Sequence, residues 1–210
     1  MGSEMCIRDS GWRGDRVSAG GGALLELGYH FIDLLIWMLG LPEEVYGLSA
    51  GGNRPGASPH DGEALPLYDT DDTAAALLRY GDGNMATVVT TRSSGPVSEE
   101  LCLHGRGGSL EARSHFCILR DPDGNVLDRL DDEDPPQALF RRQAEAFAGA
   151  VATEAGRYEC SGLENLLNLA TIEAIYLAGR TGQPERPASL LATHGLSEED
   201  CLRLRPLADE

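Results

Sequence analysis

Between Thr73 and Leu130 the chain repeats one pattern, a short run of β-forming residues followed by a turn rich in glycine or aspartate. The clearest example is a run from Thr73 to Tyr80, a Gly-Asp-Gly-Asn turn, and a second run from Met85 to Arg92, which together predict a β-hairpin. Further short runs follow at 100–104, 109–113, 116–120 and 126–130. Strands joined by tight turns pair antiparallel, so we predict a meander of about six strands.

Three helical patterns flank this predicted sheet. The first runs from about Gly22 to Leu39 and stops at Gly40, with Pro42 just beyond. The other two, Ala138–Thr153 and Gly162–Gly182, each carry an apolar stripe that predicts packing onto the sheet. The expected fold class is therefore α+β, an open antiparallel sheet of about six strands with helices packed on one face. Between them, the stretch Ser49–Asp69 is rich in glycine and proline and predicts a surface loop.

The first helical pattern follows three consecutive glycines and carries an acid and an imidazole. Residues four apart share one face of an α-helix, so Glu26 and His30 are expected side by side, with Asp33 one turn further along. A carboxylate beside an imidazole can tune a proton-transfer group near neutral pH, which makes Glu26 and His30 the catalytic candidates. We expect no metal at these residues, because three side chains along one helix do not converge well on an ion.

The order and spacing of residues around this helix resemble the sugar and cyclitol dehydrogenases of the Gfo/Idh/MocA family. The residues that carry the resemblance are Trp12-Arg13, Gly20-Gly21-Gly22, Glu26, His30, Asp33, Trp37 and Gly40-Leu41-Pro42. Glu26 stands where the family usually has aspartate, which keeps the charge and adds a methylene. A second family element, a Gly-x-x-Gly-Ser-Leu-Glu turn, is matched at Gly105–Glu111.

This resemblance implies that residues 11–190 form a substrate-binding and oligomerisation domain, followed by a tail over residues 191–210. The whole enzyme would move a hydride between a carbinol carbon of a sugar, cyclitol or related polyol and the nicotinamide of NAD or NADP. By the same resemblance, His30 would take the hydroxyl proton and Glu26 would orient or charge-tune His30. Arg13 and Tyr29 would contact the substrate, Asp33 would have a structural role, and the open sheet face would build a homo-oligomer.

No segment supplies the dinucleotide site that such an enzyme needs. That site requires a strand followed by Gly-x-Gly-x-x-Gly at the start of a helix, and neither Gly20–Gly22 nor Gly105–Gly108 meets the requirement. The family's Lys-Pro dipeptide is also missing, and the chain contains no lysine. We therefore expect the cofactor to bind mainly to an N-terminal Rossmann domain that this chain lacks. The chain would then be N-terminally truncated and inactive alone, with residues 1–10 a non-native leader.

Charge and cysteine content exclude several other partners. Seventeen basic and thirty-four acidic side chains leave a net charge of −17, which repels nucleic acid and anionic lipid. The longest apolar candidate for a membrane span, Phe31–Leu41, is short and contains Asp33. The five cysteines form no Cys-x-x-Cys pair, which is typical of reduced thiols and predicts a cytoplasmic protein without a disulfide framework or zinc site.

A second interpretation stays open, namely a noncatalytic module that binds sugar or drives oligomerisation. The position of Glu26 and His30 distinguishes the two, because a catalytic pair must face an accessible surface. The sequence does not distinguish sugar, cyclitol and amino-sugar substrates, nor NAD from NADP.

Overall fold

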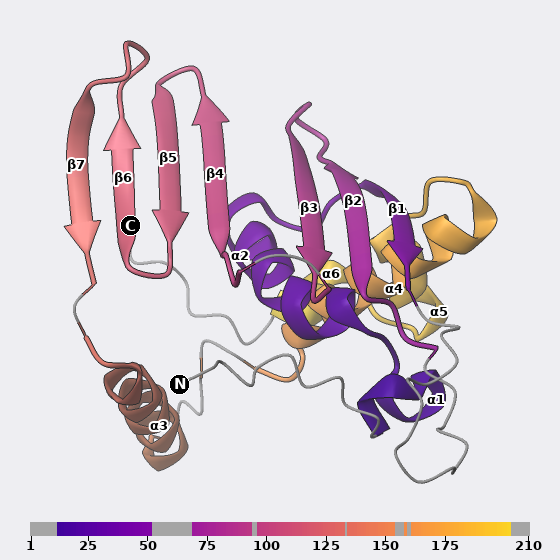
Figure 1. Ribbon diagram of the computed structural model, residues 1–210. Helices are drawn as coiled ribbons and strands as arrows, with labels where there is room; N and C mark the ends of the chain where they lie inside the picture. Colours follow the sequence, from indigo (N-terminus) through magenta and orange to yellow (C-terminus); the bar gives the residue numbers. More distant parts are fainter. Residues whose placement is uncertain are drawn as a thin grey trace, which may run out of the picture. The chain divides into compact units, whose positions relative to one another are not determined.

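The computed structural model describes residues 12–51, 69–93, 96–132, 134–153, 158 and 161–202 (Figure 1). The chain divides into two compact units, one containing residues 1–94 and 159–210 and the other residues 95–158. The leader predicted at residues 1–10 and most of the loop predicted at Ser49–Asp69 lie outside the described residues.

A three-stranded antiparallel sheet forms the centre of the first unit, in the order β1-β2-β3. Its strands are β1 (Glu44–Ala50), β2 (Thr73–Arg79) and β3 (Met85–Thr91). The pair β2 and β3 is the predicted hairpin, with Thr73 opposite Thr91 and Arg79 opposite Met85. Alternate residues of β2 are buried, which gives the sheet one core face and one outward face.

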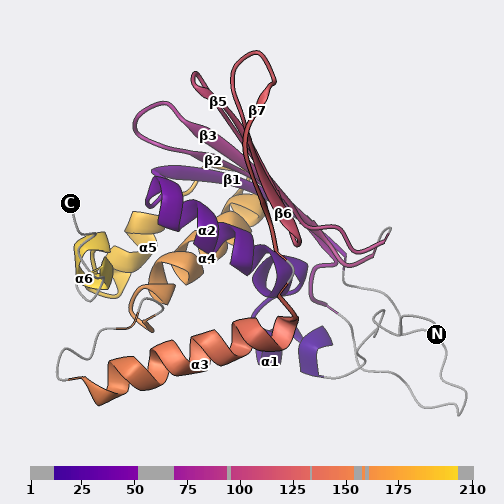
Figure 2. The ribbon, with the colours of Figure 1, turned by 90° about the vertical axis from the view of Figure 1, so that its left-hand side faces the viewer.

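Helices cover the core face of this sheet (Figure 2). The helix α4 (Asn165–Thr181) packs against β1 and against α2 (Tyr29–Leu39), and a π-helical turn, η2 (Leu24–Gly28), leads into α2 and contacts β3. The core contains Leu24, Ile32, Val45, Leu78, Leu167, Ile172 and Ile175, each almost fully buried. The smaller helical elements of this unit are η1 (Trp12–Gly14), α1 (Arg16–Ala19), α5 (Pro187–Thr193) and α6 (Glu198–Leu202).

Close contact between β1 and α4 depends on a glycine. A Cβ atom at Gly47 would lie 2.4 Å from the carbonyl oxygen of Ile175, and one at Gly179 would lie 3.2 Å from the carbonyl oxygen of Gly47. Any side chain at Gly47 would therefore push the helix away from the strand.

The second unit contains a four-stranded antiparallel sheet in the order β4-β5-β6-β7. Its strands are β4 (Glu100–Gly105), β5 (Gly108–Arg113), β6 (Phe116–Arg120) and β7 (Val126–Asp131), and the helix α3 (Pro136–Ala152) follows them. Cross-strand pairing places Leu103, Leu110 and Leu119 in one row on one face. The opposite face carries charged residues such as Glu111 and Arg129.

These observations confirm the predicted α+β class and antiparallel pairing, with two differences. The described residues form seven strands, one more than predicted because β1 was not expected, and the strands lie in two sheets where one was predicted. The prediction that both later helices pack on a sheet holds for α4, whereas the apolar side chains Phe140, Phe147 and Val151 of α3 are exposed.

The structure also bears on the predictions about a membrane span, the C-terminal tail and the cysteines. One stretch of the described residues, Arg16–Leu39, is long and apolar enough to span a membrane, a test that core helices also pass. The predicted boundary at residue 190 falls inside α5, where Leu191 is buried. The cysteines at 102, 117 and 201 are free thiols.

Candidate active site

A single carboxylate holds the start of the helix that carries Glu26 and His30. The backbone N–H groups of Gly22 and Leu24 donate to the Asp71 side chain at 2.8 and 2.9 Å, and the Tyr176 hydroxyl donates to it at 2.7 Å. Asp71 thus satisfies two helix-start amides from the loop before β2. The pKa of Tyr176 is raised, mainly by burial and secondly by the hydrogen bond to Asp71.

The close approach of Asp71 and Tyr176 to the start of the helix requires glycine at positions 21 and 22. A Cβ atom at Gly22 would lie 2.0 Å from the Asp71 carbonyl oxygen, and one at Gly21 would lie 2.5 Å from the Tyr176 hydroxyl. The amides that could have held a phosphate instead donate to a protein carboxylate. The amides at the end of the glycine run are therefore engaged within the protein.

Glu26 lies between two arginines. Its carboxylate is 3.2 Å from the Arg13 Nε atom and 3.2 Å from the Arg92 Nη1 atom. Arg92 also donates to the Asp71 carbonyl oxygen at 3.0 Å and lies 3.9 Å from the Asp72 carboxylate. This cluster joins the N-terminal turn, the π-helical turn and the end of β3 around one acid, and the extra methylene of glutamate gives that acid its reach.

His30 is exposed on α2, at an accessible surface of the first unit. No hydrogen bond or ion pair joins it to Glu26 among residues with described positions. Glu26 bonds instead to Arg13 and Arg92, and it lies in the π-helical turn Leu24–Gly28 that precedes α2. The ring of Tyr29 meets the His30 ring edge-on, with centroids 6.1 Å apart.

The residues on either side of His30 bond to α4. The Tyr29 hydroxyl donates to Asn165 Oδ1, and Asn168 Nδ2 donates to the Asp33 carboxylate at 2.7 Å. Asp33, for which the family resemblance implied a structural role, thus accepts a hydrogen bond from a buried amide. Asn168 is 1 % exposed.

Chemically, the arrangement offers an accessible imidazole for proton transfer and a fixed carboxylate and guanidinium pair for contacts to hydroxyl groups. Within the described ranges, no group of three or more His, Cys, Asp or Glu side chains could hold a metal ion.

Four residues of this site were not found by sequence reasoning: Asp71, Arg92, Asn165 and Asn168. Asp71 caps a helix start that lies 47 to 49 residues earlier in the chain, so no local pattern identifies it. Arg92 ends the predicted hairpin, and nothing local indicates that it reaches Glu26. The two asparagines interrupt the apolar pattern of α4, and a polar residue in a buried stripe signals a bonded partner.

Comparison with known proteins gives a family. The family model described as GFO/IDH/MocA C-terminal domain matches residues 2–111, just over half of the chain. A protein of Amycolatopsis mediterranei (strain S699), named as an oxidoreductase subunit of a UDP-kanosamine synthase, is 30% identical over 118 residues. That match covers 52% of this chain and 33% of the relative.

Solved structures share the fold at low sequence identity. An oxidoreductase domain protein from Kribbella flavida has a TM-score of 0.72 and 21% identity, covering 84% of this chain and 54% of that one. Levoglucosan dehydrogenase with NADH and L-sorbose has a TM-score of 0.73 and 19% identity, covering 84% and 53%. Aldose-aldose oxidoreductase from Caulobacter crescentus with glycerol has a TM-score of 0.66 and 23% identity, covering 86% and 52%. The chain therefore spans a third to about half of the length of these relatives.

Proposed function

Because the chain belongs to the GFO/IDH/MocA family of oxidoreductases, we propose that it forms the substrate-binding part of an NAD- or NADP-dependent enzyme. The substrate is a sugar, cyclitol or related polyol, oxidised or reduced at a carbinol carbon. The observation that carries this proposal is the exposed His30 on a helix anchored at its start by Asp71. Two structural neighbours, levoglucosan dehydrogenase with NADH and L-sorbose and an aldose-aldose oxidoreductase with glycerol, support the substrate class and the cofactor.

In this proposal His30 takes the hydroxyl proton as the alcohol becomes a carbonyl. Glu26, paired with Arg13 and Arg92, accepts a hydrogen bond from a neighbouring substrate hydroxyl rather than touching His30. Arg13, the more exposed of the two arginines, donates to substrate oxygens. Tyr29 is the remaining substrate contact, through the lone pairs of a hydroxyl whose proton is directed at Asn165.

The cofactor, NAD or NADP, supplies the hydride acceptor when bound. The amides of the glycine turn are engaged by Asp71, so the pyrophosphate would be held mainly by a nucleotide-binding domain outside these residues. The shares of relatives that the chain leaves uncovered are large enough for such a domain. We therefore expect this chain alone to turn over no substrate. We also place the protein in the cytoplasm.

The test begins with the reading frame that surrounds the codon for Gly11 in the source genome. The protein encoded by that whole reading frame, called the uninterrupted product below, is purified. It is assayed for reduction of NAD and NADP with a panel of sugars and cyclitols. We expect activity in this product and none in the 210-residue chain. The variant His30→Gln should lower kcat by about 100-fold or more.

His115→Gln is the matched control, because His115 is an exposed histidine of the second unit. It should leave kcat unchanged. Full activity of His30→Gln would remove His30 from the reaction, and activity of the 210-residue chain alone would show that no further domain is needed.

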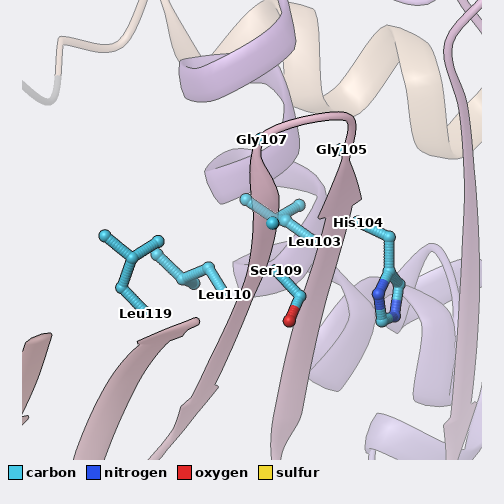
Figure 3. Close-up of a pocket in the computed structure, with 8 residues that line it drawn as sticks. Leu103, His104, Gly105, Gly107, Ser109, Leu110 and Leu119 are labelled. Atoms are coloured by element: carbon cyan, nitrogen blue, oxygen red, sulfur yellow. The ribbon is translucent and has the colours of Figure 1, made fainter. Parts of the chain in front are cut away.

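We also propose that copies of the chain associate through open sheet faces. The outward face of β1–β3 exposes Tyr46, Leu48, Leu77 and Val89 around a hollow of about 480 Å³. In the second unit, Leu103, Leu110 and Leu119 from three neighbouring strands line a depression of about 320 Å³ at the β4–β5 turn, with His104 pointing away from them (Figure 3). Apolar surface gathered on sheet faces favours association.

Sedimentation of the chain at several concentrations tests this association. We expect a dimer or larger species, and Val89→Asp should shift it toward monomer, because a charge on the outward face of β3 would be buried without a partner. Asp82→Asn, in the exposed β2–β3 turn, is the control. A monomer at all concentrations would contradict association, whereas an oligomer with no activity in the uninterrupted product would favour the noncatalytic module.

A further inference from the structure

Polar contacts join α2 to α4 on both sides of His30. Asn168 Nδ2 donates to Asp33 Oδ1 at 2.7 Å and to Asn165 Oδ1 at 3.3 Å. The Tyr29 hydroxyl donates to the same Asn165 oxygen, and Asn165 Nδ2 donates to the Ser161 carbonyl oxygen at 2.8 Å. These residues make one continuous chain of hydrogen bonds from the start of α4 to the middle of α2.

An amide at position 168 is unexpected on packing grounds. The side chain lies in the buried stripe of α4, beside Leu167 and Thr171, where an apolar residue would fill the same space. Burying an amide is unfavourable unless it is bonded, and here the bond goes to an acceptor on another helix.

Apolar packing and hydrogen bonds constrain a helix differently. Contact between apolar surfaces is non-directional, so it tolerates small rotations of α2 about its own axis. A hydrogen bond has a narrow range of length and angle, and two such bonds at Tyr29 and Asp33 fix that rotation. His30 follows Tyr29 directly and precedes Asp33 by three residues, so the two bonds bracket it.

We propose that Asn168 is a positioning residue for His30, acting through Asp33, with Asn165 and Tyr29 as the second point of attachment. The role of His30 in proton transfer rests on the proposed function above. The orientation of His30 by the asparagine pair is a separate claim that can be tested without activity.

The test uses nuclear magnetic resonance of the histidine rings in the 210-residue chain, with three variants. Asn168→Asp is nearly isosteric and places two carboxylates against each other. Asp33→Asn combined with Asn168→Asp exchanges donor and acceptor, so the bond forms again in the opposite direction. Asp33→Ala removes the acceptor at an exposed position, and it decides the question if Asn168→Asp does not fold.

We expect the His30 ring signal to shift or broaden in Asn168→Asp and in Asp33→Ala, and to return to its original position in the exchanged double variant. The signals of His104 and His115, in the second unit, should stay unchanged in all three. An unchanged His30 signal in the single variants would overturn the proposal. So would a double variant that regains its stability without regaining the His30 signal, because the contact would then be structural only.

In the uninterrupted enzyme, the same variants separate this inference from the proposed function. Asn168→Asp should lower kcat by about tenfold or more with KM little changed, and the double variant should restore it. If His30→Gln is fully active while the ring signals respond as expected, the proposed function fails and the orientation of His30 by Asn168 stands.

Discussion

Asp71 shows how much one buried carboxylate can organise. It is 8% exposed, and its two oxygens accept from Gly22, Leu24 and Tyr176, three residues that are far from it in sequence. Several N–H and O–H bonds to one carboxylate offset the free-energy cost of burying it. Substitution of a residue that bonds to Asp71 should therefore lower the free energy of unfolding.

Tyr176→Phe removes one of these bonds with little change in volume. We expect the free energy of unfolding to fall by about 1–2 kcal/mol, because the Asp71 oxygen then loses a donor inside the protein. Urea unfolding followed by circular dichroism measures it. The control is Tyr46→Phe, whose exposed hydroxyl lies 3.4 Å from Glu44 and should matter little. Equal stabilities of the two variants would show that the Tyr176 bond contributes nothing.

Buried tyrosines also predict how stability depends on alkaline pH. Burial raises the pKa of Tyr80 from 10.0 to about 12, and burial together with Asp71 raises that of Tyr176. The folded state holds these protons after the unfolded state has released them. Stability is therefore fully present below pH 10 and falls as pH rises toward 12, by about 1.4 kcal/mol per pH unit for each group.

Unfolding free energies measured at several values between pH 9 and pH 12 test this dependence, with the range set by the Tyr80 shift. Tyr80→Phe should reduce the slope, and Tyr46→Phe should leave it unchanged. A flat profile in the parent chain would contradict the assignment of both tyrosines.

The candidate site could be predicted from sequence only in part, for reasons visible at single residues. His30 was found because its spacing to Glu26 and Asp33 is local. The contact between Glu26 and Arg92 was not predicted, because Arg92 lies 66 residues away and reaches Glu26 only after β3 pairs with β2. The expected side-by-side placement of Glu26 and His30 assumed a regular α-helix, whereas Glu26 lies in a π-helical turn that contacts β3.

At the scale of elements, boundaries marked by glycine and proline agree well between sequence and structure. Gly40 ends α2 with a φ of 80°, and the hairpin turn at 81–84 joins β2 to β3 as predicted. The strand β1 was missed because Gly47 lowers its strand propensity. That glycine is explained only by the helix that packs on it, which is nonlocal information.

Gly47→Ala tests the contact between β1 and α4. The new Cβ would lie 2.4 Å from a backbone oxygen, so the helix must move, and we expect a loss of about 1–3 kcal/mol in urea unfolding. Gly149→Ala provides the contrast, because that glycine lies inside α3 with open space around it. Alanine there should raise helix stability by about 0.5–1 kcal/mol. Equal stability of Gly47→Ala and the parent chain would show that β1 and α4 do not approach as closely as described.

At the scale of the whole molecule, charge is the dominant sequence property. The chain has thirty-four acidic and seventeen basic side chains, so charge repulsion within the folded chain exceeds attraction. Raising the salt concentration from about 0.01 M to about 0.1 M shortens the screening length from about 30 Å to about 10 Å. We expect Tm to rise by about 2 °C or more over this range.

Differential scanning calorimetry in NaCl and in KCl checks this expectation. The two salts should give the same rise, because screening depends on ionic strength and not on the identity of the cation. A falling Tm would mean that attractive pairs such as Glu26 with Arg13 and Arg92 outweigh the excess of negative charge.

The anchoring of the active-site helix by Asp71 has a consequence for the order in which the protein is made. Gly22 and Leu24 precede Asp71 by 49 and 47 residues, and Tyr176 follows it by 105. During synthesis the glycine turn leaves the ribosome well before its cap does, and the tyrosine that completes the cap follows 105 residues after that. The helix that carries His30 therefore reaches its final start only after Asp71 and Tyr176 have both been synthesised, so the histidine acquires its place long after its own codon is read.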